Sequence, residues 1–149
     1  MIEAASADAR ELLATLHARA FDKGWSAAEI AKLMENTAVF ALVSRAEEAQ
    51  GFVMGWTAAG DAELLTVAVV PEARRKGVGA TLVTAAGVVA LVRGAASMHL
   101  EVAEDNEAAR ALYAKLGYEE SGRRPAYYGG ERGSIDAIVM RRTLPRPVV

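Results

Sequence analysis

A run of β-branched residues leads directly into a basic, glycine-containing turn in the middle of the chain, and this junction limits the fold more than any other feature. Residues 67–70 read Val-Ala-Val-Val, which is typical of a buried strand, and Pro71 stops that strand. Three basic residues and two glycines follow and open a helical pattern: Arg74, Arg75, Lys76, Gly77 and Gly79. The first N–H groups of a helix lack intrahelical partners and carry about half a positive charge. The junction therefore predicts a strand–turn–helix unit whose turn binds a pyrophosphate-like anion.

Other phosphate-binding motifs do not fit this turn. The chain has neither a G-x-x-x-x-G-K-[ST] loop nor a G-x-G-x-x-G fingerprint, so a dinucleotide-binding fold is disfavoured. A lone G-x-G is a short motif, and by itself it also fits a tight turn that carries a solvated basic patch. On the turn alone, the anion site and the structural turn are about equally favoured.

Composition narrows the class of protein further. The 149 residues suit one domain with a substantial core, and 52% apolar with 24% charged residues is normal for a globular chain. The absence of cysteine excludes disulfides, thiolate metal sites and a cysteine nucleophile. Because His17 and His99 are the only two histidines, we expect no metal site.

Charge and hydropathy bear on partners and location. A formal net charge of −2 disfavours extensive nucleic-acid binding, which usually leaves a basic footprint. The longest weakly charged run, residues 77–92, is shorter than the roughly 20 apolar residues of a membrane span, and the first residues lack the pattern of a signal peptide. We therefore expect a cytoplasmic protein without a membrane partner.

The apolar pattern predicts a single mixed α/β domain over residues 1–149, with 144–149 as a flexible tail. Three strand-like segments separated by turn residues predict an antiparallel meander, and the basic turn then begins a βαβ centre. The expected strands are 1–4, 38–44, 51–57, 62–70, 98–102, 118–122 and 135–141. The expected helices begin after Ser6 (to about Ala20) and at Ser26, and span 77–93 and 106–116.

Helix boundaries carry recognisable signals. Ser6 and Asn106 are expected N-caps, and Ser26 with Glu29 has the spacing of a capping box. Gly117 suits the position just beyond a helix end, where positive φ is cheap for glycine.

The motif Arg74-x-x-Gly77-x-Gly79 after a valine-rich strand resembles the acetyl-CoA pyrophosphate loop of the GNAT N-acetyltransferases, and the element order of nearly the whole chain fits that family. The resemblance implies a mixed central sheet of about six to seven strands with about four helices, acetyl-CoA as co-substrate and no metal. It implies that the strand pairs with the pantetheine arm through backbone groups and that the turn holds the pyrophosphate. The residues so implicated are Val67, Ala68 and Val69 for the arm, and Arg74, Arg75, Lys76, Gly77, Val78, Gly79 and Ala80 for the pyrophosphate.

Residues 100–118 resemble the L-E-V-x-x-x-N-x-x-A-x-x-L-Y-x-x-L-G signature of one branch, the ribosomal-protein-alanine N-acetyltransferases. Shorter stretches resemble its F-x-W-S, R-R-x-Y-Y and D-A-x-x-M motifs: Phe21 with Trp25-Ser26, Arg123-Arg124 with Tyr127-Tyr128, and residues 136–140. The likeness implies transfer of acetyl to the N-terminal alanine of a small-subunit ribosomal protein by direct attack in a ternary complex.

The resemblance assigns roles to residues that also have simpler interpretations. Glu101 points to the face opposite its strand neighbours; it is either a solvent-facing residue or, by the resemblance, the general base. Tyr113 either packs its helix or, by the resemblance, protonates the departing CoA thiolate. Asn106 caps its helix, and in the family the matching residue also contacts the cofactor. The Val69 N–H is a candidate donor to the thioester oxyanion.

The acceptor side is less defined. Trp25, Tyr127 and Tyr128 are candidates to line a substrate groove, or else simply pack in the core or at an edge. Asp136 either binds a cationic amine or begins a strand. Three departures from the branch's motifs fall here: a longer stretch at 21–26 without proline, an extra residue at 125–126, and Ile135 where the branch has glutamate.

Two alternatives therefore stay open beside the predicted acetylation of an N-terminal alanine. One is a related acetyltransferase for another amine, whether a small molecule, a lysine or an aminoacyl-tRNA. The other is an acyl-CoA-binding or partner-binding module without catalysis, which the presence of both Glu101 and Tyr113 disfavours. The sequence does not determine the oligomeric state.

Overall fold

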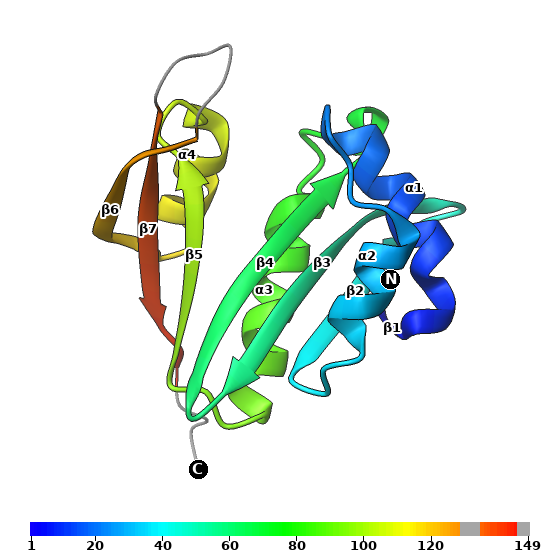
Figure 1. The fold of residues 1–149 in the computed structure, drawn as a ribbon, viewed down its shortest axis with the longest axis horizontal. Coiled ribbons are helices and arrows are strands. Elements are labelled where there is room, and N and C mark those ends of the chain that lie inside the picture. The colour runs from blue at the N-terminus through cyan, green and yellow to red at the C-terminus, as the bar shows by residue number, and fades with distance from the viewer. Residues whose placement is uncertain (129–134, 146–149) are drawn as a thin grey trace.

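The computed structural model describes residues 1–128 and 135–145, and of residues 126–128 the main chain alone. Within these residues the chain forms a seven-stranded mixed sheet with four α-helices and two 3₁₀ turns, which confirms the expected α/β fold (Figure 1). The strands are β1 (Ile2–Ala5), β2 (Val39–Arg45), β3 (Ala49–Ala58), β4 (Asp61–Val69), β5 (Ser97–Ala103), β6 (Glu119–Tyr128) and β7 (Ile135–Thr143). The helices are α1 (Arg10–Ala20), α2 (Ala27–Met34), α3 (Val78–Val92) and α4 (Glu107–Lys115), and the 3₁₀ turns are η1 (Ala7–Ala9) and η2 (Pro71–Ala73).

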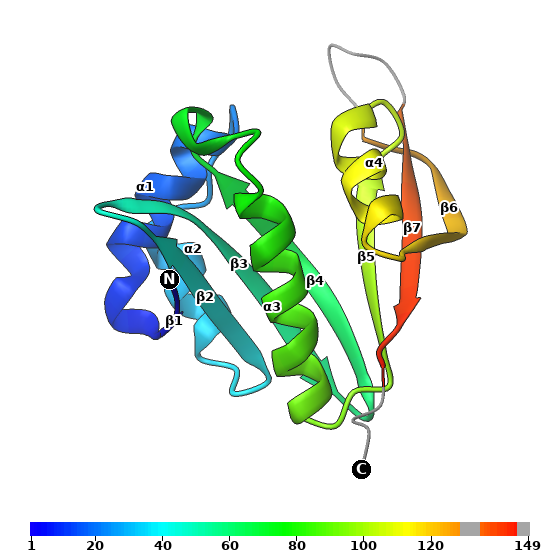
Figure 2. The same cartoon turned by 180° about the vertical axis from the view of Figure 1, so that it is seen from behind.

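The strand order is β1-β2-β3-β4-β5-β7-β6. Strands β2 to β4 form the predicted antiparallel meander, and β1 adds antiparallel to β2. Strands β4 and β5 pair in parallel, and β7 inserts antiparallel between β5 and β6. Helices α1 and α2 cover one face of the sheet, and α3 and α4 cover the other (Figures 1 and 2). We call these the α1/α2 face and the α3/α4 face.

Helix α3 is the most apolar of the four, with Leu82 and Ala86 fully buried on its sheet-facing side and Val92 exposed at its end. It has 15 residues, and none of the helices in the described ranges combines the length and apolar character that crossing a membrane needs.

The local signals at helix ends are mostly confirmed. Ser26 and Glu29 form the capping box, with the Ser26 hydroxyl accepting from the Glu29 N–H at 3.1 Å. Asn106 caps α4 through its side chain, and Gly117 follows that helix at φ +94°. The expectation at Ser6 is wrong: its side chain makes no cap hydrogen bond, because the helix there begins with the 3₁₀ turn η1.

The predicted end of the sixth strand is also wrong. The pattern favoured a short strand ending at Gly122, whereas β6 continues to Tyr128. Pro125 lies within β6 and cannot donate to a ladder, but β6 is the last strand of the sheet, where a missing donor is tolerated. The register with β7 shifts between Arg124 and Tyr128, at the same place.

Strands β4 and β5 part soon after they meet. Their parallel ladder pairs only three residues of each strand, from Asp61↔Ser97 to Glu63↔His99. Beyond this ladder the two strands diverge (Figure 1). The register of β3 against β4 also skips Leu65, which therefore forms a β-bulge just where the divergence begins.

Side chains tie the closed end of this split. The Asp61 carboxylate accepts from the Ser97 hydroxyl at 2.9 Å and lies 3.0 Å from the His99 Nε2. The split therefore opens from a fixed point and divides the sheet into β1–β4 and β5–β7–β6.

Glycine at position 51 is required by the close approach of β3 to β4. A Cβ at Gly51 would lie well inside van der Waals contact of the Ala68 carbonyl oxygen and 3.1 Å from the Val69 Cα. We expect Gly51→Ala to lower the free energy of unfolding by about 1–3 kcal/mol, because both neighbours are backbone atoms that must shift. Denaturant unfolding measures the effect.

Gly122→Ala is the matched control, because a Cβ there would make only ordinary contact, 3.7 Å from the Val139 Cβ. Equal unfolding midpoints for the two variants would contradict the prediction.

Candidate active site

The split between β4 and β5 leaves one edge of β4 without a strand partner at Val67, Ala68 and Val69. On their other side these residues pair with β3, in the register Val53↔Val67 to Gly51↔Val69. Since the β4–β5 ladder ends at Glu63, outward backbone N–H and C=O groups of 67–69 face the split. An extended ligand can add there as a strand would.

The basic turn stands at the open end of the same strand. Gly77 has φ +81° and caps α3, and its carbonyl accepts from the N–H and the hydroxyl of Thr81, both at 3.0 Å. The first N–H groups of α3 follow at Val78, Gly79 and Ala80, where a helix leaves its donors without intrahelical partners. Arg75 also has positive φ, at +63°, so the chain turns sharply on both sides of Lys76.

The three cations of the turn have different surroundings. The Arg74 guanidinium donates to the carbonyls of Val69 and Ala20, each at 3.1 Å, so in this structure it joins the end of β4 to the end of α1. Arg75 and Lys76 are exposed and have no ion-pair partner among the described residues. The geometry therefore favours Arg75 and Lys76 over Arg74 as contacts for an anion.

Glu101 lies on β5, just past the point where the strands part. Leu100 and Val102 are buried, whereas the Glu101 side chain turns to the opposite face and is 21% exposed. Its Oε1 lies 2.9 Å from the Arg124 Nη2, so a guanidinium from β6 neutralises the carboxylate. Sequence reasoning did not foresee this pair, which depends on the order of β5, β7 and β6.

Tyr113 on α4 packs edge to face against Tyr118, which follows the helix, with ring centroids 5.9 Å apart. Burial raises the pKa of each phenol to about 12. Tyr113 therefore stays protonated at neutral pH and is a weaker acid than a free tyrosine. Asn106 at the start of α4 accepts from the Ala109 N–H at 3.2 Å, so its capping role is present.

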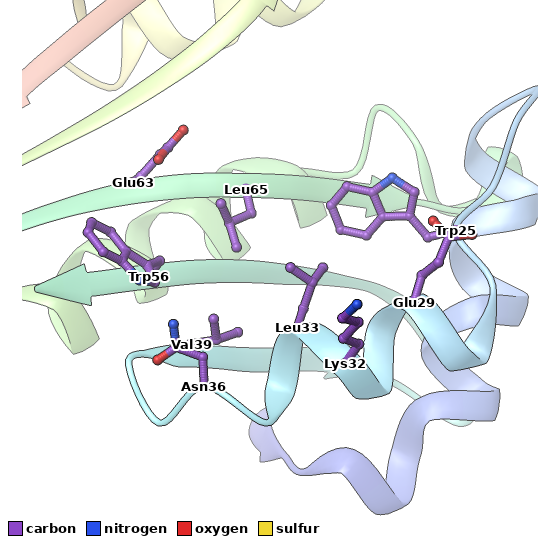
Figure 3. A pocket seen from close by; sticks show the side chains of 9 residues that line it. All are labelled: Trp25, Glu29, Lys32, Leu33, Asn36, Val39, Trp56, Glu63 and Leu65. Atoms are coloured by element: carbon purple, nitrogen blue, oxygen red, sulfur yellow. The ribbon is translucent and has the colours of Figure 1, made fainter.

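An open groove of about 650 Å³ runs along the α1/α2 face between α2 and strands β2 to β4 (Figure 3). It is lined by Trp25, Glu29, Lys32, Leu33, Asn36, Val39, Trp56, Glu63 and Leu65. The expectation that Trp25 lines a groove agrees with this lining. Sequence reasoning missed Trp56 and Glu63. The alternation of side chains along each strand could have indicated them, because it places both residues on the same face of the sheet.

The remaining acceptor-side candidates are less informative. The side chains of Tyr127 and Tyr128 lie outside the described residues. Asp136 pairs with Arg123 at 2.8 Å, and Arg123 also reaches Glu104 at 2.9 Å. This arrangement favours a structural role for Asp136 near the start of β7. In the described ranges, no group of three or more His, Cys, Asp or Glu side chains is placed to hold a metal ion.

His17 is a site-supporting residue that sequence reasoning missed. It is 3% exposed, and its ring stacks on the Trp25 indole with the ring centroids 4.6 Å apart. Its Nδ1 accepts a hydrogen bond from the backbone N–H of Trp25 at 3.0 Å. Because Nδ1 accepts, Nε2 carries the proton and donates to the Thr66 hydroxyl at 3.1 Å. His17 thus connects α1, the segment before α2 and β4, and it orients one end of the groove.

Comparisons with known proteins agree with this architecture. Residues 7–118 match the acetyltransferase (GNAT) family. A Bacillus subtilis protein, named provisionally as a [ribosomal protein bS18]-alanine N-acetyltransferase, is 31% identical over 116 residues, which cover 76% of this chain and 74% of that one. The Escherichia coli K12 enzyme of the same name is 40% identical over 80 residues, 54% of each chain.

A solved structure gives the same result for the fold. The crystal structure of the ribosomal-protein-S18-alanine N-acetyltransferase from Escherichia coli superposes with a TM-score of 0.90 at 26% identity, covering 99% of this chain and 96% of that one. The chain spans about half the length of the curated Escherichia coli relative that it matches in sequence. These similarities confirm the resemblance inferred from the basic turn and the 100–118 signature.

The buried imidazole of His17 predicts a pH dependence of stability. Burial lowers its pKa in the folded protein, with a smaller opposing effect of Glu29. The unfolded state therefore binds a proton more readily, so His17 stabilises the fold fully above about pH 6.5 and less as the pH falls below it. We expect the urea midpoint to fall between pH 7 and pH 5, and less steeply in His17→Gln, which itself costs about 1–3 kcal/mol.

The other histidine supplies the control. His99→Gln removes that histidine, whose side chain is about a third exposed beside Asp61, and leaves the buried His17 in place. If His99→Gln flattens the profile and His17→Gln does not, the assignment to His17 is wrong.

Proposed function

The chain belongs to the acetyltransferase (GNAT) family, and from that premise we propose that it transfers acetyl from acetyl-CoA to the N-terminal alanine amine of a small-subunit ribosomal protein. The observation that carries the proposal is the parting of β4 and β5, which leaves the free edge of β4, the basic turn and Glu101 around one opening. Relatives named as acting on the alanine of ribosomal protein bS18 support the choice of acceptor.

Acetyl-CoA binding would use main-chain groups more than side chains. The free edge at 67–69 suits the amides of the pantetheine arm, and the N–H groups at the start of α3 suit the pyrophosphate. Arg75 and Lys76 add charge at the same turn. The Arg74 side chain holds the turn in shape through the Val69 and Ala20 carbonyls.

Glu101 is the proposed general base. An N-terminal ammonium has a pKa near 8, so a modest base suffices to remove its proton at neutral pH. In the free protein the Glu101 carboxylate is held by Arg124, and the incoming ammonium would compete with that guanidinium. The amine nitrogen then bonds to the acetyl carbonyl carbon, for which the Val69 N–H is a candidate oxyanion donor.

Tyr113 is the proposed general acid. As the C–S bond breaks, its hydroxyl would donate a proton to the CoA thiolate. A phenol with a pKa of about 12 is a poor donor to a thiol with a pKa of about 8.5 in water. A buried site that raises the pKa of the phenol also raises the pKa of the CoA thiol, because burial disfavours the charged thiolate. The difference between the two pKa values is therefore smaller in the site than in water. Close positioning of the two groups offsets part of the remaining difference.

The choice of acceptor amine is the least constrained part of the proposal. The sequence departures at 21–26, at 125–126 and at Ile135 all fall on the acceptor side. An assay of acetyl-CoA turnover with peptides beginning Ala-Arg, Met and Ser, and with free lysine, separates the alternatives. Transfer to lysine alone would exclude the N-terminal alanine activity, and tight acetyl-CoA binding without turnover on any amine would favour a binding module.

Glu101→Gln tests the base. The amide keeps the shape of the side chain but cannot take a proton, so we expect kcat to fall by about 10²-fold or more while acetyl-CoA still binds. Steady-state kinetics and isothermal titration with acetyl-CoA measure the two effects. The exposed Glu119→Gln on β6 is the matched control; an active Glu101→Gln enzyme at all pH values would rule out this role.

Tyr113→Phe tests the acid. The ring and its packing remain but the proton is lost, so we expect kcat to fall by about 10²-fold with little change in stability. Tyr118→Phe is the control in the same aromatic pair, because the Tyr118 hydroxyl is buried without a hydrogen-bond partner in the described structure and its loss should not destabilise the fold. Equal losses of kcat in the two variants would argue against a specific role for Tyr113.

A further inference from the structure

One end of the groove on the α1/α2 face is built differently from the other. Val39, Trp56 and Glu63 pair with one another across β2, β3 and β4, so their side chains stand in one row on the same face. Figure 3 shows Trp56 and Glu63 together at one end, while Lys32 lies with Glu29 toward the Trp25 end. Leu33 and Leu65 lie between the two ends.

Glu63 is the charged side chain at this end of the groove. It is exposed and has no hydrogen bond or ion pair with any described residue. Glu29 differs, since its Oε1 lies 3.1 Å from the Ser26 hydroxyl and 3.4 Å from the Ser26 N–H in the capping box. The C-terminal end of α2 also points toward Asn36 at the Trp56 end, and a helix C-terminus favours cations.

The position of Glu63 connects this end to the proposed reaction. Glu63 pairs with His99, the last pair of the β4–β5 ladder. Glu101 is two residues further along β5 and therefore faces the same side of the sheet as His99. A peptide whose amine reaches Glu101 would thus have its next residues close to Trp56 and Glu63.

The chemistry at this end matches one kind of side chain. An indole face attracts a cation, a free carboxylate forms a charge-assisted hydrogen bond with it, and apolar neighbours accommodate its aliphatic stem. A neutral aromatic side chain would use Trp56 but would leave the Glu63 carboxylate without a partner. An acidic side chain would be repelled.

We propose that Trp56 and Glu63 bind the side chain of a lysine or arginine that follows the acceptor amine, so that the preferred acceptor is an N-terminal segment with a basic residue near its start. This inference rests on the proposed function, since it assigns acceptor specificity to the same site. Trp56 and Glu63 are specificity residues in this proposal and take no part in proton transfer.

The test uses alanine-initiated peptides that differ only at the second residue, which is arginine, neutral citrulline or phenylalanine. We expect the wild-type kcat/KM to favour arginine over citrulline by about tenfold, mainly through KM, because citrulline keeps N–H donors but lacks the positive charge that strengthens the contacts with Glu63 and Trp56. In Glu63→Gln the ratio should fall well below the wild-type value, to what the cation–π contact with Trp56 alone provides, whereas Glu119→Gln should keep the wild-type ratio.

Three outcomes would overturn the proposal. They are an unchanged arginine-to-citrulline ratio in Glu63→Gln, an equal fall of kcat with both peptides, which would assign Glu63 to the chemistry, and a wild-type preference for phenylalanine over arginine.

A binding measurement separates this inference from the proposed activity. The chain has two tryptophans, so peptide binding can be followed by the fluorescence of a Trp25→Phe variant in which Trp56 is the only reporter. Arginine-dependent quenching that Glu63→Gln abolishes would support the binding site even if no peptide is acetylated. Absence of such quenching, together with normal acetylation, would refute the binding site and leave the activity standing.

Discussion

The short parallel ladder between β4 and β5 is the constraint on which the rest of the structure depends. Three residue pairs, and the contacts of Asp61 with Ser97 and His99, hold the two halves of the sheet together. Beyond them the strands of each half pair only with one another. Backbone groups at the edge of a strand are strong donors and acceptors that need partners. A sheet that parts in its middle therefore creates an extended polar edge, which the proposed function assigns to the acyl donor.

The charged side chains on the two sides of the split have different partners. Arg74 is held by carbonyls and shapes the turn, which leaves Arg75 and Lys76 for solvent or an anion. On the other side of the split Arg124 balances Glu101. A carboxylate that is only 21% exposed would be costly to hold uncompensated, and the Arg124 guanidinium supplies the opposite charge at 2.9 Å.

The parts that the sequence predicted are those that depend on neighbouring residues. The Ser26 capping box, the end of β4 near Pro71 and the Asn106 cap each involve groups within a few positions of one another. The parts that it did not predict depend on register between distant segments. His17 meets Thr66 across 49 residues, Arg124 reaches Glu101 across an intervening strand, and the bulge at Leu65 exists only relative to β3. Ser6 failed as a cap because a 3₁₀ turn replaced the first helical turn, a choice that residue type does not decide.

The two halves of the proposed site place different demands on the sequence. The cofactor side is built largely from main-chain groups: an open strand edge, positive φ at Arg75 and Gly77, and the first N–H groups of a helix. Many side chains are compatible with that geometry, so it specifies the family without specifying the acceptor. The proposed acceptor side is instead lined by side chains such as Trp25, Trp56 and Glu63. Membership of the family therefore determines the acyl donor much more tightly than the amine, and the identity of the amine must be sought in the groove along α2.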